Sequence, residues 1–500
     1  MRVVIALFAL IAGVADASSC GIFSYHSEVE SSDTLMMHWN STSTSAHAVV
    51  HIVVTPSAGR GVAPQKYVLT KCTSAADKAE VQAEYSDAVV ITVPVKGLTA
   101  IDTVQIALLD TLDKYTLLRA YPQPLLISST VVRTWILNPD HLVESHVAPD
   151  GYGGFGTDFA AQANVSNVDV HLSSIFEYGA SGETAYTAAG VRDKMVLINE
   201  IDEGTPLGRA EWIKVVGLLT GKEAEAQVQF SQIKAKYETA KSFVAQATSQ
   251  PKVWYNGFYY DIWYPAKSGQ YTYQYLVDAY TQYVLPSNEV FPVGGMKWAR
   301  GLELAGKAQF WLSNSQSWAS LSSAAAASSG VPLVDFSALS NLAPFGCENV
   351  WDNDLSSETV VGLDYPRNDF FESGVINPDQ ILKEIIMIVH PELSAIGSHK
   401  YFRHVPSGTL KRNCPFDASS SPATTTTTAT TTKSTTASKD TGATAKAVGL
   451  TGLNLGLTVA VAILGSSLIA LALATSIIFQ RRMRAARVMT KFSENSALGA

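Results

Sequence analysis

Aromatic side chains are concentrated in one stretch of this sequence. Between Trp254 and Tyr283, twelve of the 30 residues are Trp, Tyr or Phe, whereas these residues make up 9% of the whole chain. Tyr and Trp rings bury apolar area, stack on flat partners and still offer a polar tip for hydrogen bonding. The stretch therefore predicts either a hydrophobic core or a surface that binds a flat or apolar small molecule.

Local pattern divides this stretch into a strand, a turn and a helix. KVWYNGFYY is strand-like and QYTYQYLVDAYTQYVL is helical, which leaves residues 261–269 between them, and we expect a turn at the start of this connection, up to residue 264. Trp263 and Tyr264 could stack on a ligand there, and packing in the core is the alternative. Tyr259 and Tyr260 are neighbours on a strand and face opposite sides, so at most one reaches a site, and we favour Tyr260.

No pattern typical of catalysis or metal binding occurs in the sequence. It contains no G-x-S-x-G, H-E-x-x-H or C-x-x-C spacing. A net charge of −8 argues against a surface for nucleic acid. We therefore expect a protein that is not an enzyme, has no intrinsic cofactor or metal site, and binds no nucleic acid.

The two ends of the chain predict export and membrane anchoring. Residues 1–17 have a basic start, an apolar run and an Ala-Asp-Ala cleavage pattern, as in a secretory signal peptide. Residues 455–479 carry no charge and are long enough to cross a bilayer, and the Arg-rich tail at 480–500 favours the cytoplasmic side. Residues 416–450 read as a Ser/Thr-rich stalk or a plain disordered linker. We expect a single-pass type I protein of the plasma membrane with an extracellular or lumenal ectodomain.

Cysteines and glycosylation acceptors fit an exported chain. Four cysteines in a secreted protein suggest two disulfides, for which three pairings are possible. We favour pairing Cys20 with Cys72 and Cys347 with Cys414, since each pair joins a chain end to the nearest domain. Asn-x-Ser/Thr acceptors occur at Asn40 and Asn164.

Between these ends the pattern is that of an α/β protein. Apolar strands and turn clusters alternate over residues 34–95, and from about residue 99 strands alternate with helices. Asp102 and Thr205 are predicted N-caps. Another predicted helix is capped by Asn377 and stopped by Pro391. From Ala226 to Val244, apolar residues recur at steps of 4, 3, 4, 3 and 4, which predicts a long, half-exposed helix between two α/β regions. Two α/β lobes bridged by a helix are the simplest arrangement.

Three strings in this order resemble one family. TPLGRAEWIKVVGLLTGKEAEA, DIWYPAKSGQYTYQYLVDAYTQYV and RNDFFESGVINPDQILKEIIMIVHPEL resemble segments of bacterial periplasmic substrate-binding proteins of iron-chelate ABC importers. That family includes binders of ferric siderophores, haem and cobalamin, and the likeness extends over about residues 90–405. The resemblance implies two lobes joined by one rigid helix, with a shallow ligand cleft between them. Unlike bacterial relatives, this chain has its own predicted membrane anchor.

The resemblance also implies which residues line the cleft. The aromatic turn of the family corresponds to residues 261–264, and its Asn-Asp-Tyr-Trp string corresponds to residues 368–371. Two Phe residues in this string lack the hydroxyl of Tyr and the indole N–H of Trp. An adjacent arginine could reach an anionic ligand, and a strand-to-helix loop of the first lobe approaches the cleft. The predicted ligand-binding residues are Asp102, Thr103, Tyr260, Asp261, Trp263, Tyr264, Arg367, Asn368, Asp369 and Phe371.

Together these observations predict a domain organisation and a function. The predicted order is a signal peptide at 1–17, a strand-rich preamble at 18–85, an N-terminal lobe at 86–206, a bridging helical segment at 207–249, a C-terminal lobe at 250–415, a stalk at 416–450, a transmembrane helix at 455–479 and a tail at 480–500. We expect a surface receptor that captures a ferric siderophore, haem, cobalamin or a similar small molecule, with a possible uptake or permease partner. The alternative is an adhesion or scaffold protein that kept the fold without the ligand.

Overall fold

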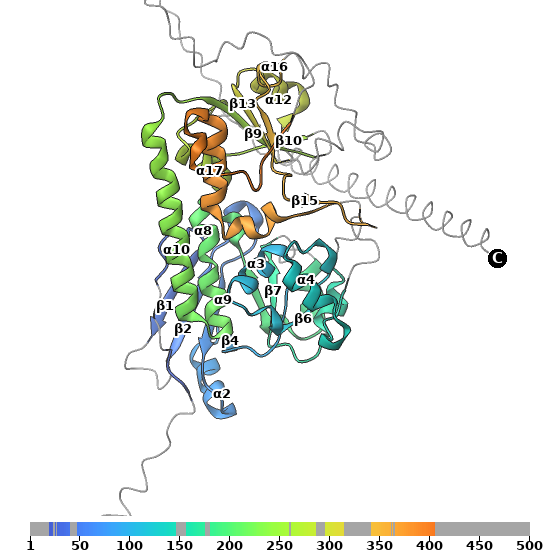
Figure 1. The fold of residues 1–500 in the computed structure, drawn as a ribbon. Helices are drawn as coiled ribbons and strands as arrows, with labels where there is room; N and C mark the ends of the chain where they lie inside the picture. The colour runs from blue at the N-terminus through green and yellow to red at the C-terminus, as the bar shows by residue number, and fades with distance from the viewer. Residues whose placement is uncertain are drawn as a thin grey trace, which may run out of the picture. The chain divides into compact units, whose positions relative to one another are not determined.

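A computed structural model provides the structure of this chain (Figure 1). The residues it describes are 20–23, 26, 28–40, 48–146, 157–175, 181–259, 262–286, 296–314, 342–361, 363 and 366–405. The predicted signal peptide, stalk, apolar segment 455–479 and tail lie outside these ranges. Within them, no helix combines the length and apolar character needed to span a bilayer.

The strand-rich preamble forms a four-stranded sheet in the order β1-β2-β3-β4. Its members are β1 (Leu35–Asn40), β2 (Val49–Val54), β3 (Gln65–Thr70) and β4 (Val89–Thr92), and α2 (Ala75–Glu84) connects the last two. All four strands were predicted from alternating apolar runs. The predicted boundary at residue 85 cuts this sheet, however, because β4 pairs in parallel with β3.

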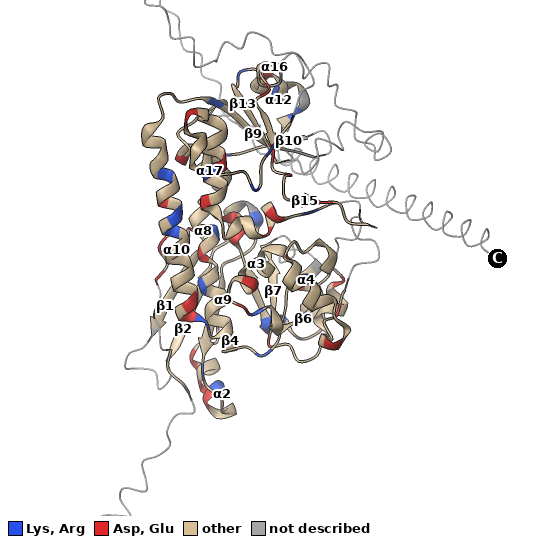
Figure 2. Cartoon of the chain, viewed as in Figure 1, with Lys and Arg blue, Asp and Glu red and all other residues tan. Residues whose placement is uncertain are grey.

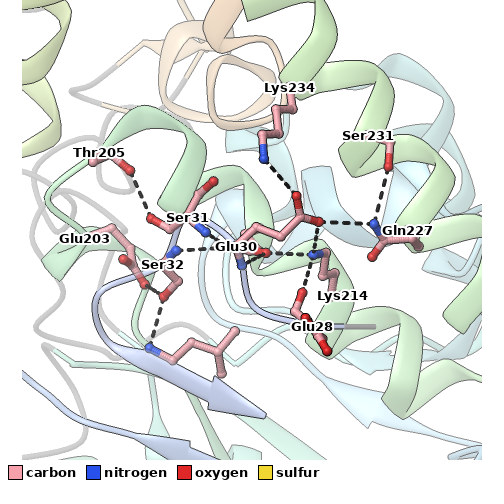
Figure 3. Close-up of polar contacts among 12 residues, drawn as sticks. Glu28, Glu30, Ser31, Ser32, Glu203, Thr205, Lys214, Gln227, Ser231 and Lys234 are labelled. Atoms are coloured by element: carbon pink, nitrogen blue, oxygen red, sulfur yellow. Dashed lines mark hydrogen bonds and ion pairs between the residues drawn. The ribbon is translucent and has the colours of Figure 1, made fainter. Parts of the chain in front are cut away.

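A chain segment before β1 is attached to the bridging helices by buried carboxylates. Glu211 is fully buried, and its carboxylate accepts the backbone N–H groups of residues 30, 31 and 32 at 2.7–2.9 Å. It also receives the ammonium group of Lys214 at 2.6 Å. Lys214 and Lys234 both point toward the Glu30 carboxylate (Figure 3), and the Lys234 ammonium lowers the pKa of Glu30 to about 2. This network joins the preamble to the centre of the fold.

The first lobe contains a parallel sheet in the order β6-β5-β7-β8. Its strands are β5 (Leu98–Thr99), β6 (Leu118–Ala120), β7 (Val170–Ser174) and β8 (Met195–Ile198), and its helices are α3 (Thr103–Thr111), α4 (Thr130–Leu137), α5 (Phe159–Ala163) and α7 (Ser181–Ala188). The predicted cap of α3 is confirmed, because the Asp102 carboxylate accepts the N–H of Val104 at 2.8 Å.

The bridging segment is helical but is not one continuous helix. It consists of α8 (Pro206–Glu211), α9 (Ile213–Thr220) and α10 (Glu223–Ser242). Thr205 caps α8 as predicted, and Gly221 ends α9 in the left-handed conformation, which glycine adopts without strain. Along α10 the predicted stripe from Ala226 to Ala240 is buried. This helix contacts α8 and α9 of the bridge and α17 of the second lobe (Figure 1).

The second lobe is built on a sheet in the order β12-β10-β9-β13-β14-β17, with β11 beside β9. Its strands are β9 (Lys252–Tyr259), β10 (Ile262–Pro265), β11 (Gln282–Tyr283), β12 (Met296–Lys297), β13 (Phe310–Ser313), β14 (Val350–Asp352) and β17 (Arg403–His404), and a separate hairpin pairs β15 (Ser357–Glu358) with β16 (Arg367–Asn368). Its helices are α11 (Tyr271–Asp278), α12 (Trp298–Ala305), α16 (Ala343–Gly346) and α17 (Pro378–Val389).

Two local predictions in the second lobe are wrong. Residues 262–264, predicted as part of a turn, belong to β10, which pairs with β9 on one side and β12 on the other. The predicted helix beyond Tyr271 stops at Asp278, because Tyr280 has a φ of 52° that breaks the helix before β11. By contrast, α17 begins after Asn377 and ends before Pro391 as predicted.

The first disulfide of the favoured pairing is confirmed. Cys20 is bonded to Cys72. Cys347 is also disulfide-bonded, and its predicted partner Cys414 lies outside the described residues. The glycosylation acceptor Asn164 is exposed at the end of α5, whereas Asn40 ends β1 and its side chain is outside the described part of the chain. Glycosylation at both sites stays a prediction.

Candidate functional site

A cleft of about 490 Å³ lies between the first and second lobes. The first lobe contributes α3 and the residues at the start of α4. The second lobe contributes the hairpin β15–β16, the chain that follows it and one lysine near β17. The polar residues that line the cleft are Asp110, Ser128 and Ser129 from the first lobe and Ser356, Ser357, Glu358, Arg367, Asp369, Glu372, Ser373, Asn377 and Lys400 from the second.

On the first lobe, helix geometry brings an acidic residue to the cleft. Ala107 and Asp110 are three residues apart on α3, so they share one face, and both line the cleft. Ser128 and Ser129 precede α4, and the Ser129 hydroxyl accepts the N–H of Val132 as its N-cap. The cleft therefore meets the C-terminal half of α3 and the N-terminus of α4.

On the second lobe, the predicted arginine is used within the protein. Arg367 donates from Nε to Oε2 of Glu358 at 2.8 Å, and these residues form an ion pair across the β15–β16 hairpin. Its Nη1 also lies 3.4 Å from the backbone oxygen of Leu125 in the first lobe. Arg367 thus lines this cleft and is already paired with an acidic residue.

Asn368 and Asp369 organise the turn that leads into the cleft. Asn368 is buried, accepts the N–H of Phe370 at 3.0 Å and donates to the backbone oxygen of Asn353 at 3.0 Å. Asp369 accepts from the Ser373 hydroxyl at 2.6 Å and pairs with the Lys400 ammonium at 2.9 Å. Asp369 is among the lining residues of the cleft, whereas Asn368 is not.

Glu372 connects the two lobes directly. Its carboxylate, on a residue that is 2% exposed, accepts the N–H of Ser128 at 2.6 Å and the N–H of Ser129 at 2.8 Å. Burial, together with the neighbouring Asp369 and Asp110 carboxylates, raises the pKa of Glu372 to about 7 in spite of these two bonds. Acidic residues therefore line the cleft from both lobes. Figure 2 marks the acidic and basic positions of the chain on the ribbon.

A second buried polar group lies beside the start of α3. The guanidinium of Arg209 pairs with Glu200 at 2.5 Å and stacks over the Tyr271 ring at 4.0 Å. Burial raises the pKa of both Asp102 and Glu200, and the positive charge of Arg209 partly opposes that rise. Asp102 and Thr103 are not among the residues that line the cleft, and the carboxylate of Asp102 is used as the helix cap.

The predicted aromatic surface is not part of this cleft. Trp263 is 1% exposed and packs against Trp311, with ring centroids 5.5 Å apart. It therefore lies in the core, which was the alternative to stacking on a ligand. It fits because position 301 is glycine, where a Cβ atom would lie 2.3 Å from the Trp263 ring. Tyr264 alternates to the other face of β10 and is 45% exposed.

The remaining predicted residues are placed as follows. Tyr260 and Asp261 lie outside the described residues. Phe371 is half-buried and packs on Phe370, with centroids 5.2 Å apart. Of the ten predicted ligand-binding residues, the structure brings Arg367 and Asp369 to the cleft.

Sequence reasoning missed Asp110, Ser128, Glu372 and Lys400. Glu372 is part of the string NDFFESG, where a carboxylate beside apolar residues could have signalled a special role. The other three carry no local signal, since isolated Asp, Ser and Lys residues are ordinary surface residues. Among the described residues, no group of three or more His, Cys, Asp or Glu is arranged to hold a metal ion.

Comparison with solved structures finds periplasmic binding proteins, the group that the sequence strings resemble. An ABC transporter substrate-binding protein from Listeria monocytogenes EGD-e is 14% identical and matches over 59% of this chain and 99% of its own, with a TM-score of 0.41. The apo periplasmic haem-binding protein RhuT from Roseiflexus sp. RS-1 is 10% identical over 60% and 99% of the two chains, with a TM-score of 0.41. A periplasmic binding protein from Veillonella parvula DSM 2008 is 10% identical over 72% and 99%, with a TM-score of 0.45.

No protein-family model and no curated relative matches the sequence. The identities and TM-scores of the solved structures describe a distant likeness. A function for this chain therefore has to be argued from its own cleft.

Proposed function

We propose that this chain is a non-catalytic solute-binding protein that captures a small molecule between its two lobes. The observation that carries the proposal is the cleft, whose volume of about 490 Å³ lies in the range of small-molecule sites. Both lobes supply polar groups to it, and Glu372 bonds across it. A ligand in such a position contacts both lobes and stabilises their joined form.

The bridge suits a protein whose lobes move little on binding. Helix α10 contacts both α9 and α17, and its apolar stripe is buried. A packed 20-residue helix limits hinge motion, because bending it breaks backbone hydrogen bonds. Capture then depends on side chains at the rim of the cleft and on the Glu372 contact.

The setting of this binding protein is also part of the proposal. The leader at 1–17 and the uncharged segment at 455–479 support a single-pass surface receptor with the lobes outside the cell. A ferric chelate, haem or cobalamin would be bound reversibly and passed to an uptake or permease partner. Two experiments test whether the lobes lie outside the cell. Glycosidase treatment should shift the gel mobility of the protein, and protease added to intact cells should cleave the lobes.

Ligand-dependent melting of the full-length chain tests the binding function. A true ligand at about 100 times its dissociation constant raises the free energy of unfolding by about 2.7 kcal/mol. Ferric hydroxamates, ferric catecholates, haem and cobalamin form the panel, with metal-free chelators as the control. If none of them shifts the melt or changes tryptophan emission, the scaffold alternative replaces the binding proposal.

A further inference from the structure

Among the described residues, the two cations that line the cleft are each neutralised by a carboxylate of the protein itself. Arg367 pairs with Glu358 across the β15–β16 hairpin. The ammonium of Lys400 lies 2.9 Å from Asp369 and within 3.1 Å of the hydroxyl of Ser373. Neither cation is left over to balance an anionic ligand.

Two carboxylates of the cleft lack such a balance. Glu372 receives two backbone N–H groups, and no cation pairs with it among the described residues. Asp110 has no side-chain hydrogen bond or ion pair to any part of the chain that the structure describes, and it is close enough to Glu372 to raise the pKa of that carboxyl. Among the described residues, the cleft therefore holds two carboxyl groups without a cation partner, and Glu372 is only partly ionised near neutral pH because its pKa is about 7.

The other lining groups are mainly hydroxyl and amide groups, and Ala107, Leu355 and Ile376 are the apolar residues among them. Serine hydroxyls lie on both walls, and the buried Oγ of Ser128 has no hydrogen-bond partner among the described residues. A buried hydroxyl without a partner is costly, so it favours a ligand that can bond to it. None of the described lining residues is aromatic, which leaves no ring for a flat macrocycle to stack on.

We propose that this cleft selects a hydrophilic solute with a net positive charge, bound by Asp110 and Glu372, over anionic ligands and flat macrocycles such as haem. The proposal rests on the capture function and names the ligand class for the same site. Asp110 approaches the positive group from α3, Glu372 approaches it from the opposite lobe, and the Ser128 hydroxyl bonds to a polar atom of the solute. A negatively charged solute would face two carboxyl groups without a cation partner, and its repulsion by Glu372 would grow as pH rises through the pKa of that group, about 7.

A series of ferric chelates that differ only in charge tests this selectivity. The probe is a ferric linear trihydroxamate with a terminal amine, together with its neutral N-acetyl and anionic N-succinyl derivatives. Binding to the full-length chain is measured by tryptophan quenching at low and high salt. We expect the amine form to bind at least tenfold more tightly than the succinyl form, with a difference that shrinks as salt is added.

A matched pair of substitutions assigns the charge. Asp110→Asn should weaken binding of the amine form by about tenfold and leave the N-acetyl form unchanged, because it removes the charge and keeps the shape. Asp113→Asn is the control, since Asp113 is exposed near the same helix end, does not line the cleft and has a φ of 53° that Asn tolerates. Thermal melts of both variants verify folding.

The outcomes of this experiment separate the charge selectivity, the role of Asp110 and the capture function. Equal affinities across the series, tighter binding of the succinyl form, or tighter binding of haem would overturn the charge selectivity and leave capture in place. Unchanged selectivity in Asp110→Asn would remove that residue from the site and overturn the assignment. Absence of binding by every member of the series, and by haem and cobalamin, would overturn the capture function and this inference together.

Discussion

Replacing Glu372 with glutamine should remove a pH-dependent loss of folding free energy that comes from the buried carboxylate. The carboxyl is 2% exposed, and burial raises its pKa from 4.5 to about 7. One pKa unit corresponds to about 1.4 kcal/mol, so ionised Glu372 costs the folded state about 3 kcal/mol relative to the unfolded state. Asp110 on α3 and Asp369 beside it raise the pKa, while the N–H groups of Ser128 and Ser129 lower it.

The sign of the pH effect follows from the proton count. Between about pH 4.5 and 7 the folded state holds a proton on Glu372 that the unfolded state has lost. The free energy of unfolding therefore falls as pH rises through this window, and the full contribution of this group is present only below it. Glutamine resembles the protonated form and does not titrate, so Glu372→Gln should match the wild type near pH 4.5 and be about 3 kcal/mol more stable near pH 8.

Urea denaturation of both proteins at about pH 4.5, 6 and 8, followed by tryptophan fluorescence, measures this difference. Other groups titrate in the same range, and comparing the two proteins at each pH cancels their contribution. Glu238→Gln on the exposed face of α10 is the control and should change stability by a few tenths of a kcal/mol at most. A difference between wild type and Glu372→Gln that stays constant from pH 4.5 to 8 would refute the reasoning.

Three further substitutions, one of them with a matched control, test packing in the second lobe and the attachment to the bridge, with melts and urea denaturation as the measurements. Trp263→Ala should cost about 3–5 kcal/mol because it empties a core site, whereas Tyr264→Ala at the exposed neighbour should cost under about 1 kcal/mol; equal costs would contradict the burial of Trp263. Glu211→Gln should cost about 3–5 kcal/mol because it removes the buried carboxylate 2.6 Å from the Lys214 ammonium and leaves that ammonium with the part-exposed Glu30 at 3.1 Å, and it should speed proteolysis near residue 30; unchanged cleavage would argue against that attachment. Gly301→Ala should cost about 1–3 kcal/mol through overlap with the Trp263 ring, and a neutral result would mean that the ring can move aside.

Elements with a strong local signal were predictable from the sequence. Asp102 and Thr205 could be identified as caps, because an N-cap bonds to an N–H only two or three residues along the chain. The stripe from Ala226 to Ala240 predicted the buried face of α10, because helical periodicity depends only on spacing. The end of α17 before Pro391 followed from the missing N–H of proline and its restriction of the preceding residue.

The aromatic stretch shows where local pattern is insufficient. Its strand β9 and the start of its helix α11 were predicted, and Trp263 was expected in a turn at the cleft. The structure continues that segment as β10 and fills the space over Gly301 with the indole ring. Whether an aromatic residue faces a ligand or a core depends on the partner strand and on the volume across from it, and neither is written in the local sequence.

The sequence alone determined the α/β class, the caps and breaks of the helices, and the order of lobe, helical bridge and lobe. Those features depend on residues a few positions apart. The cleft was decided only by the tertiary structure, since Glu372 meets Ser128 across 244 residues of chain. Asp110 and Lys400 are ordinary surface residues in the sequence, and they line one site because α3 and the end of the second lobe pack on opposite sides of the same gap. Charge balance in that gap is a sum over residues distant in sequence, so it could be evaluated only after the chain was folded.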